Sequence, residues 1–226
     1  MTSKWDKQYS EKADKFASTE HWQKEAMMVQ RLELGGRKGV LAPKLTPLTV
    51  LDLGCNTGAF LDVLFRSGVT GHINYIGIDP NQEALRALTI RRDNIPLLSK
   101  VVDTSMENQP SESVDIVVCL HAINQMEDWD KELEHVYRVL KPKGKLVITT
   151  HNVWWGKARR LQTLLSSYTS DSTMVREPTK TQVVRKLKQD IGFKVKFARY
   201  FDSVEDRHQD LIASLVGNRL IVLAEK

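Results

Sequence analysis

The sequence predicts an α/β fold built around a parallel, doubly wound sheet. Short apolar segments typical of strands alternate along residues 47–150 with longer segments typical of helices. The strand segments are continuous apolar runs, a pattern that indicates parallel strands covered by helices on both faces. Strands and helices in alternation favour right-handed crossovers within one layered domain. A chain of 226 residues is long enough to bury a core of its own.

The first unit of this pattern is a strand, a glycine turn and a helix. The strand contains Val50, Leu51 and Leu53, and the helix begins at Gly58. Gly54 and Gly58 let the backbone turn sharply and approach a ligand with no Cβ atom in between. The N-terminus of the helix directs unpaired N–H groups toward the space above the turn. The stretch therefore predicts a ligand-binding turn of a kind that many nucleotide sites share.

The second unit narrows the class of ligand. Its strand, residues 73–78, is followed by Asp79, which lies 25 residues after Gly54. An acidic side chain at this place can accept hydrogen bonds from both hydroxyls of a ribose. A helix-capping aspartate before Pro80 is the alternative. The dinucleotide fingerprint requires G-x-G-x-x-G, and Asn56 and Ala59 occupy two of its glycine places, which disfavours a pyrophosphate site.

Together with three later motifs, these units resemble the class I S-adenosylmethionine (SAM)-dependent methyltransferases. The motifs are Asp-Leu-Gly-Cys-Asn-Thr-Gly at 52–58, Asp79, Val102-Asp103 after a third strand, a fourth strand at 114–119, and Arg-Val-Leu-Lys-Pro-Lys-Gly-Lys-Leu at 138–146. The last of them is similar to the family's R-V-L-K-P-G-G-x-L turn into its fifth strand. The resemblance covers residues 47–150 well and the rest of the chain in outline.

The resemblance implies a mostly parallel seven-stranded sheet with an antiparallel last strand and helices on both faces. The residue pattern places a fifth strand at 144–150, a helix at 182–191 and the last two strands at 193–201 and 220–224. Residues 1–40 are expected to form an N-terminal helical cap over the cofactor site. Residues 46–226 then form the SAM-binding domain, with 151–178 as an insert on the acceptor side.

The resemblance also assigns cofactor contacts to residues at the ends of the predicted strands, where open α/β sheets bind their ligands. Asp52 and the glycine turn are assigned to the methionine moiety, and Asp79 to the ribose. Asp103, with the N–H of Thr104, is assigned to the adenine edge, a plain loop cap being the alternative. The predicted cofactor residues are Tyr9, Asp52, Gly54, Cys55, Asn56, Gly58, Asp79, Pro80, Asp103, Thr104, Leu120 and His121.

Two of these residues carry a specific expectation. Tyr9 or Trp5 is expected to close the site from the N-terminal helix, and docking of the helix on the core by both aromatics is the alternative. Asn56 stands where the family commonly has its central glycine. Because asparagine tolerates a left-handed backbone, we expect the turn to keep its shape.

Catalytic residues are the least defined part of the prediction. Alignment of acceptor and methyl group can contribute roughly 7–11 kcal/mol, and a positioned base adds on the order of 10²- to 10⁴-fold. His121 after the fourth strand and His151 after the fifth are the candidate bases, each with a structural role at a strand end as the alternative. The loop after the fourth strand holds Asn124-Gln125 where relatives often carry a histidine. The base is therefore expected from His121, His151 or the insert, unless the acceptor needs none.

Charge is unevenly distributed along the chain. Residues 151–200 hold eleven Lys and Arg against three Asp and Glu, a net charge of +8, while the whole chain carries +5. Such an excess can attract an anionic partner, although a solvated helix face is the alternative. We expect a small-molecule acceptor, with an anionic one included, and place nucleic acid second. No cluster with metal-ligand spacing is present in the sequence, so no metal is predicted.

The remaining features bear on compartment. No apolar run reaches 18 residues, and the charged N-terminus has no signal-peptide core. Cys55 and Cys119 lack a partner nearby in sequence, which favours a reduced compartment. The sequence therefore predicts a cytoplasmic enzyme that methylates a small molecule. An RNA methyltransferase that uses residues 151–200 and a SAM-binding partner protein without catalysis are the two alternatives.

Overall fold

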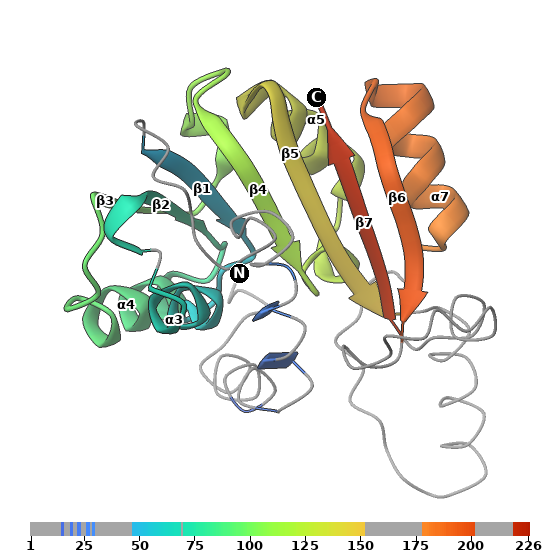
Figure 1. Cartoon of the computed structure of the whole chain (residues 1–226). Helices are drawn as coiled ribbons and strands as arrows, with labels where there is room; N and C mark the ends of the chain where they lie inside the picture. The colour runs from blue at the N-terminus through green and yellow to red at the C-terminus, as the bar shows by residue number, and fades with distance from the viewer. Residues whose placement is uncertain are drawn as a thin grey trace, which may run out of the picture.

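The computed structural model describes residues 15, 19, 22–23, 26–27, 29, 47–68, 70–151, 178–201 and 219–226. These residues form one twisted sheet with helices on both faces (Figure 1). The strands are β1 (Leu48–Leu53), β2 (Ile73–Ile78), β3 (Ser99–Asp103), β4 (Val114–Leu120), β5 (Leu140–His151), β6 (Lys194–Phe201) and β7 (Arg219–Glu225). The helices are α3 (Ala59–Arg66), α4 (Gln82–Arg91), α5 (Trp129–Val139) and α7 (Lys180–Arg185), and short 3₁₀ turns η1 (Thr70–His72), η2 (Met106–Asn108) and η3 (Ile123–Gln125) join them.

The sheet has seven strands in the order β3-β2-β1-β4-β5-β7-β6. Strands β1 to β5 pair in parallel, and β7 runs antiparallel to both of its neighbours, β5 and β6. The predicted doubly wound sheet with an antiparallel last strand is therefore confirmed. The chain order reverses between β1 and β4, so that the carboxyl ends of these two strands form the switch point where open α/β sheets bind ligands.

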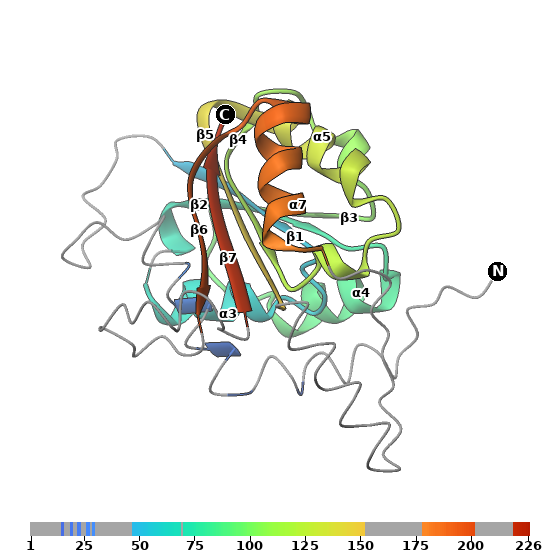
Figure 2. The ribbon, with the colours of Figure 1, turned by 90° about the vertical axis from the view of Figure 1, so that its right-hand side faces the viewer.

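The two faces of the sheet carry separate cores. On one face, α3 and α4 pack with Trp22, Ala26 and Val29 against Tyr75 and neighbouring strand residues. On the other face, α5, α7 and the π-helical turn η4 (Lys186–Ile191) pack against the sheet. Figure 2 shows α5 and α7 side by side on one side of the sheet. The carboxyl ends of the central strands therefore lie between the two layers of helices.

Local sequence explains most element boundaries. Asn81 caps α4 by accepting from the N–H groups of Glu83 and Ala84, and Thr179 and Gln182 form a capping box at the start of α7. The predicted strand 73–78 is observed with the same bounds. The expected helix at 182–191 begins earlier, at Lys180, and its second half is a π-helix.

Strand β5 begins earlier than the predicted 144–150. Leu140 pairs with Val114 on β4, and the ladder resumes after a register shift. Just before this strand, in the last turn of α5, Arg138 donates to the backbone oxygens of Gln109 and Met106, at 2.6 and 2.9 Å. The Arg-Val-Leu-Lys-Pro motif therefore ties the end of α5 to the loop that precedes β4.

Parts of the predicted domain division lie outside the described residues. These are most of the cap over 1–40 and all of the insert 151–178 except His151 and Pro178. Among the described residues, no helix is long and apolar enough to cross a membrane.

Candidate active site

The turn after β1 is held in a left-handed conformation at three positions. The φ angles of Gly54, Asn56 and Gly58 are 77°, 46° and 89°. The expectation that Asn56 would adopt a left-handed backbone is confirmed. The N–H groups of Gly54 and Cys55 both donate to the carbonyl oxygen of Ile78, at 2.8 and 3.1 Å. The turn is thereby fixed to the end of β2.

Gly54 also brings the two halves of the sheet together. A Cβ atom built on Gly54 would lie 2.2 Å from the Cβ of Ala122, the second residue after β4. A Cβ on Gly58 would meet the side chains of Arg92 and Leu88 at 2.8 and 2.9 Å. Both positions therefore require glycine for space as well as for backbone conformation.

Asp79 is organised by the same turn. Its Oδ2 accepts from the N–H of Asn56 at 2.8 Å, and its Oδ1 accepts from the N–H of Asn81 at 2.9 Å. The side chain is buried, and this burial raises the pKa of the Asp79 carboxyl group. The cap of α4 is Asn81, so the helix-capping alternative for Asp79 is wrong.

Asp52 lies beneath the turn with 4% of its surface exposed. The hydroxyl of Tyr75 donates to Asp52 Oδ2 at 2.9 Å. Burial raises the pKa of Asp52 to about 7, while the hydrogen bond from Tyr75 lowers it and the nearby Asp79 raises it. Sequence reasoning missed Tyr75. The spacing of Tyr75 and Gly77 on β2, with Gly77 paired to Asp52, is the pattern that could have identified it.

Asp103 is arranged differently from Asp52 and Asp79. Its Oδ1 accepts from the N–H groups of Thr104 and Ser105, at 2.6 and 3.4 Å, and its Oδ2 accepts from Asn108 Nδ2 at 3.0 Å. These hydrogen bonds, led by the one from Asn108, lower the pKa of Asp103. Because the Thr104 N–H already has an acceptor, an adenine edge would have to share it. The geometry fits the loop-cap alternative, and the adenine assignment stays a prediction.

The two candidate bases lie together. The ring centroids of His121 and His151 are 4.7 Å apart with an interplanar angle of 44°. Residue pairing of Leu120 with Thr149 aligns the ends of β4 and β5, and the N–H of His121 donates to the Thr149 oxygen at 2.9 Å. His121 is buried and has a φ of 55°, which turns the chain sharply at the end of β4.

Further buried polar atoms lie at the same end of the sheet. Asn124 Oδ1, Thr149 Oγ1 and Thr150 Oγ1 are buried and have no hydrogen-bond partner within the part of the chain that the structure describes. Buried polar atoms normally have a partner. This end of β4 and β5 therefore has spare hydrogen-bonding capacity. Within the same described ranges, no group of three His, Cys, Asp or Glu side chains could hold a metal ion.

The other predicted residues occupy varied places. Cys55 is a buried free thiol, Pro80 is exposed and Leu120 is half-buried. Burial raises the pKa of the Cys55 thiol well above its usual value. Tyr9 lies outside the described residues.

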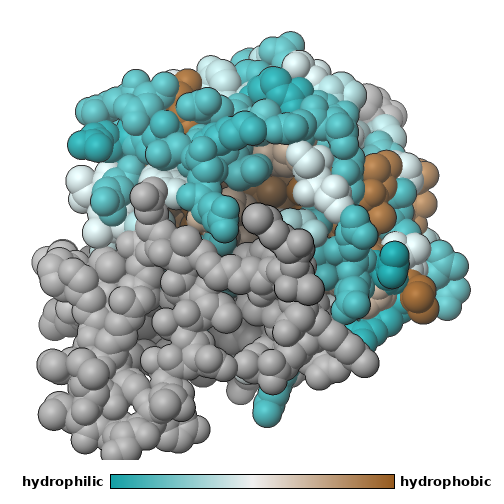
Figure 3. All heavy atoms as spheres, turned by 180° about the vertical axis from the view of Figure 1, so that it is seen from behind, coloured by the Kyte–Doolittle hydropathy of each residue, from teal (hydrophilic) through white to brown (hydrophobic). Residues whose placement is uncertain are grey.

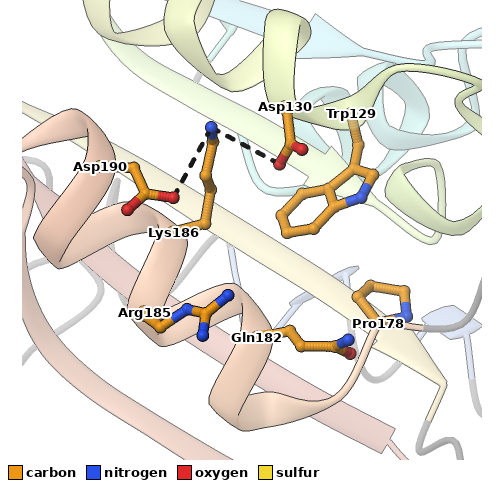
Figure 4. A pocket seen from close by; sticks show the side chains of 7 residues that line it. All are labelled: Trp129, Asp130, Pro178, Gln182, Arg185, Lys186 and Asp190. Atoms are coloured by element: carbon orange, nitrogen blue, oxygen red, sulfur yellow. Dashed lines mark ion pairs between the residues drawn. The ribbon is translucent and has the colours of Figure 1, made fainter.

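A separate pocket of about 330 Å³ lies between α5 and α7 (Figure 4). It is lined by Trp129, Asp130, Pro178, Gln182, Arg185, Lys186 and Asp190. Lys186 Nζ lies 3.7 Å from Asp130 and 3.8 Å from Asp190, so the charges in its wall are largely balanced. None of its lining residues is a predicted cofactor or catalytic residue. In the coloured part of the face seen in Figure 3, most atoms are hydrophilic, and hydrophobic atoms show in a recess between them.

Comparison with known proteins gives the family. A family model described as a methyltransferase domain matches residues 19–196, which are 178 of the 226 residues. The ubiquinone biosynthesis O-methyltransferase of Bradyrhizobium diazoefficiens is 32% identical over 109 residues, 48% of this chain and 42% of that protein. The mitochondrial ubiquinone biosynthesis O-methyltransferase of Homo sapiens is 32% identical over 114 residues, 48% of this chain and 30% of that protein. The match thus spans less than half the length of these relatives.

Solved structures share the fold. A SAM-dependent methyltransferase from Aquifex aeolicus has a TM-score of 0.62 at 18% identity, covering 96% of this chain and 97% of that one. One from Archaeoglobus fulgidus has a TM-score of 0.64 at 17% identity, covering 96% and 99%. Sheet order, glycine turn and family model agree, and this chain belongs to the methyltransferase-domain family, within the class I SAM-dependent methyltransferases.

Proposed function

We propose that this protein transfers a methyl group from SAM to an oxygen atom of a small hydroxylated molecule. The observation that carries the proposal is the left-handed turn at 54–58 with Asp52 and Asp79 beside it, at the switch point of the sheet. The choice of oxygen as acceptor is supported by the similarity to ubiquinone biosynthesis O-methyltransferases over about half of the chain.

The described residues fit SAM on the cofactor side. Each oxygen of an ionised carboxylate can accept two hydrogen bonds. Each of the two Asp79 oxygens accepts a hydrogen bond from one backbone N–H, so each can still accept a second one from a ribose hydroxyl. Asp52 would hold the ammonium group of the methionine moiety, and the glycine turn at 54–58 would lie along that moiety. Cys55, Asn56, Gly58, Pro80, Leu120 and His121 would line the same site, and Asp103 with Thr104 would flank the adenine.

On the acceptor side, we assign the role of general base to the His121–His151 pair, which would take up the proton of the acceptor hydroxyl. The two rings lie at the ends of β4 and β5, with their centroids 4.7 Å apart. A neutral ring can accept the hydroxyl proton as the oxygen attacks. When bound, SAM would supply an electrophilic methyl group to that oxygen, and its sulfur would leave as a neutral thioether. Asn124 offers a buried oxygen that could orient the acceptor hydroxyl.

A nucleic acid is the second class of acceptor. Several basic residues in the described part of 151–200 already have partners within the fold. Lys186 pairs with Asp130, Glu134 and Asp190, and Lys196 pairs with Glu225 at 3.0 Å. This pairing reduces the positive charge offered to phosphates and supports the small acceptor, an anionic one included. A cytoplasmic location is supported by the free, buried thiols of Cys55 and Cys119.

The test combines binding and turnover. Calorimetry should give saturable binding of SAM and of S-adenosylhomocysteine. Formation of S-adenosylhomocysteine should then be measured with a panel of catechols and other phenols, and with bulk tRNA at 50 and 200 mM salt. Turnover with phenols is the expected result. No SAM binding, or turnover only with tRNA, would overturn the proposal.

The role of the histidine pair has its own variant. His151→Ala should lower kcat by roughly 10²- to 10⁴-fold with SAM affinity unchanged. His72→Ala, at an exposed histidine of η1, is the matched control and should leave turnover unchanged. An unchanged kcat in His151→Ala would show that His151 is not the base.

A further inference from the structure

The strand register places a tyrosine below the cofactor turn. Asp52 on β1 pairs with Gly77 on β2, and Tyr75 lies two residues before Gly77. Because side chains alternate along a strand, Tyr75 and Gly77 face the same side of the sheet. The Tyr75 side chain is completely buried, and its hydroxyl reaches Asp52 Oδ2 at 2.9 Å.

Gly77 provides the space for this contact. A Cβ atom at Gly77 would lie 3.0 Å from Cys55 Sγ and 3.2 Å from Tyr75 Cε1. Both distances are tighter than ordinary van der Waals contact, so a side chain at Gly77 would displace the tyrosine ring or the turn. The ring therefore lies beside the bare backbone of Gly77 and directs its hydroxyl toward the carboxylate of Asp52.

We infer that Tyr75 is a positioning residue for the cofactor, which fixes one oxygen of Asp52 so that the other faces the ammonium group of SAM. The inference rests on the proposed function. Tyr75 engages Asp52 Oδ2 and, among the described residues, is the one hydrogen-bond donor to the Asp52 side chain. A carboxylate held in this way is oriented before the ligand arrives, which avoids the cost of ordering it on binding.

The charge of Asp52 depends on several groups packed around it. Asp79 at the end of β2 opposes its ionisation, and burial opposes it more strongly. The thiols of Cys55 in the turn and Cys119 on β4 are protonated because burial raises their pKa values. Burial raises the pKa values of Tyr75 and Cys55 well above their usual range, and the charge of Arg92 at the α4 C-cap is the smallest contribution and opposes this shift. The hydrogen bond from Tyr75 favours the Asp52 carboxylate. Tyr75 therefore helps to keep Asp52 ionised near neutral pH.

The experiment is calorimetric titration of SAM into the wild type and Tyr75→Phe between pH 6 and 8.5. Loss of the hydroxyl should raise the midpoint of the affinity profile by about one pH unit. The ionised fraction of Asp52 at pH 7 would then fall from about one half to about one tenth, which is a roughly fivefold loss of affinity. The ratio of the two affinities at each pH removes the titration of the ligand itself. At pH 8.5, where Asp52 is largely ionised in both proteins, Tyr75→Phe should still bind SAM more weakly, because its carboxylate is no longer held in place.

Two controls separate positioning from a general disturbance. 5′-Methylthioadenosine keeps the adenine and ribose but lacks the ammonium and carboxylate, so its affinity should be equal in both proteins. Tyr137→Phe changes a tyrosine of α5 whose ring packs on Phe193, and it should bind SAM like the wild type. Thermal unfolding verifies that Tyr75→Phe is folded.

The outcomes are distinct. Superimposable pH profiles for wild type and Tyr75→Phe would overturn the inference and leave the proposed function standing. An equal loss for SAM and 5′-methylthioadenosine would also overturn it, since the variant would then have distorted the whole site. Absence of SAM binding by the wild type would overturn the proposed function itself.

Discussion

The two halves of the candidate site differ in how their polar atoms are held. In the β1–β2 half, Asp79 accepts two backbone N–H groups and Asp52 accepts the Tyr75 hydroxyl. In the β4–β5 half, buried oxygens of Asn124 and Thr149 have no hydrogen-bond partner among the described residues. The comparison indicates a cofactor side that is organised in advance and an acceptor side that keeps hydrogen-bonding capacity for its ligand.

The largest expected effect comes from overpacking the contact between the two halves of the site. Gly54→Ala should lower the free energy of unfolding by roughly 2–5 kcal/mol, because left-handed strain costs about 1–2 and overpacking about 1–3 kcal/mol. The overpacking arises from the 2.2 Å approach of the new Cβ to Ala122. Urea denaturation measures the change, and SAM binding should be lost.

Gly68→Ala is the matched control for Gly54→Ala. Gly68 also has a positive φ, 72°, but a Cβ there meets nothing within 4 Å. It should therefore show only the backbone strain. Adding Ala122→Gly to Gly54→Ala should recover part of the stability. Equal losses at Gly54 and Gly68 would show that contact between the halves is unimportant.

The second-largest expected effect tests how much folding stability is lost by burying the Asp52 carboxylate in the cofactor half. Burial raises the pKa of Asp52 from 3.8 to about 7, so between these pH values the folded state binds a proton that the unfolded state has released. Stability from this group is therefore complete below pH 4 and is lost as the pH rises to about 7. Asp52→Asn should exceed the wild type in free energy of unfolding by a few kcal/mol at pH 8, with little gain at pH 4.

The same variant should lose affinity for SAM, which links stability and binding through one carboxylate. Urea denaturation at the two pH values measures the first effect and calorimetry the second. Asp93→Asn, at an exposed aspartate 3.7 Å from Lys100, is the control and should change neither. A pH-independent difference between Asp52→Asn and wild type would contradict the assigned titration.

The third effect compares two carboxylates assigned to the cofactor. Asp79→Ala should weaken SAM binding by about 1–3 kcal/mol, the usual consequence of removing a buried hydrogen-bonding partner. Asp103→Ala should weaken it less, because the half-buried Asp103 side chain bonds to its own loop. Calorimetry of both variants decides the ranking. Unchanged affinity in Asp79→Ala would remove the ribose assignment.

The smallest effect lies at the opposite end of the sheet. Lys143 has a φ of 66°, and its N–H donates to the carbonyl oxygen of Lys226 at 3.2 Å. Lys143→Gly should raise the free energy of unfolding by up to about 1 kcal/mol, because glycine adopts this conformation without strain. SAM affinity should not change. Gly144→Ala should be destabilising instead, since its Cβ would lie 2.8 Å from the Lys141 oxygen.

Whether an element was predicted correctly depends on how far apart in the sequence the residues lie whose contacts form it. Strand β2 was predicted with its observed bounds because an apolar run ends there at Asp79. The start of β5 was misplaced because Leu140 pairs with Val114, 26 residues earlier, across a register shift. Such pairing leaves no local pattern in the sequence.

The same division holds within the site. The sequence by itself determined the glycine turn and the place of Asp79, because the backbone conformations that Gly54, Asn56 and Gly58 adopt are local properties of those residue types. Only the tertiary structure decided that Tyr75 bonds Asp52 and that His121 contacts His151. Both contacts depend on the register of neighbouring strands, which is set by packing across the whole sheet.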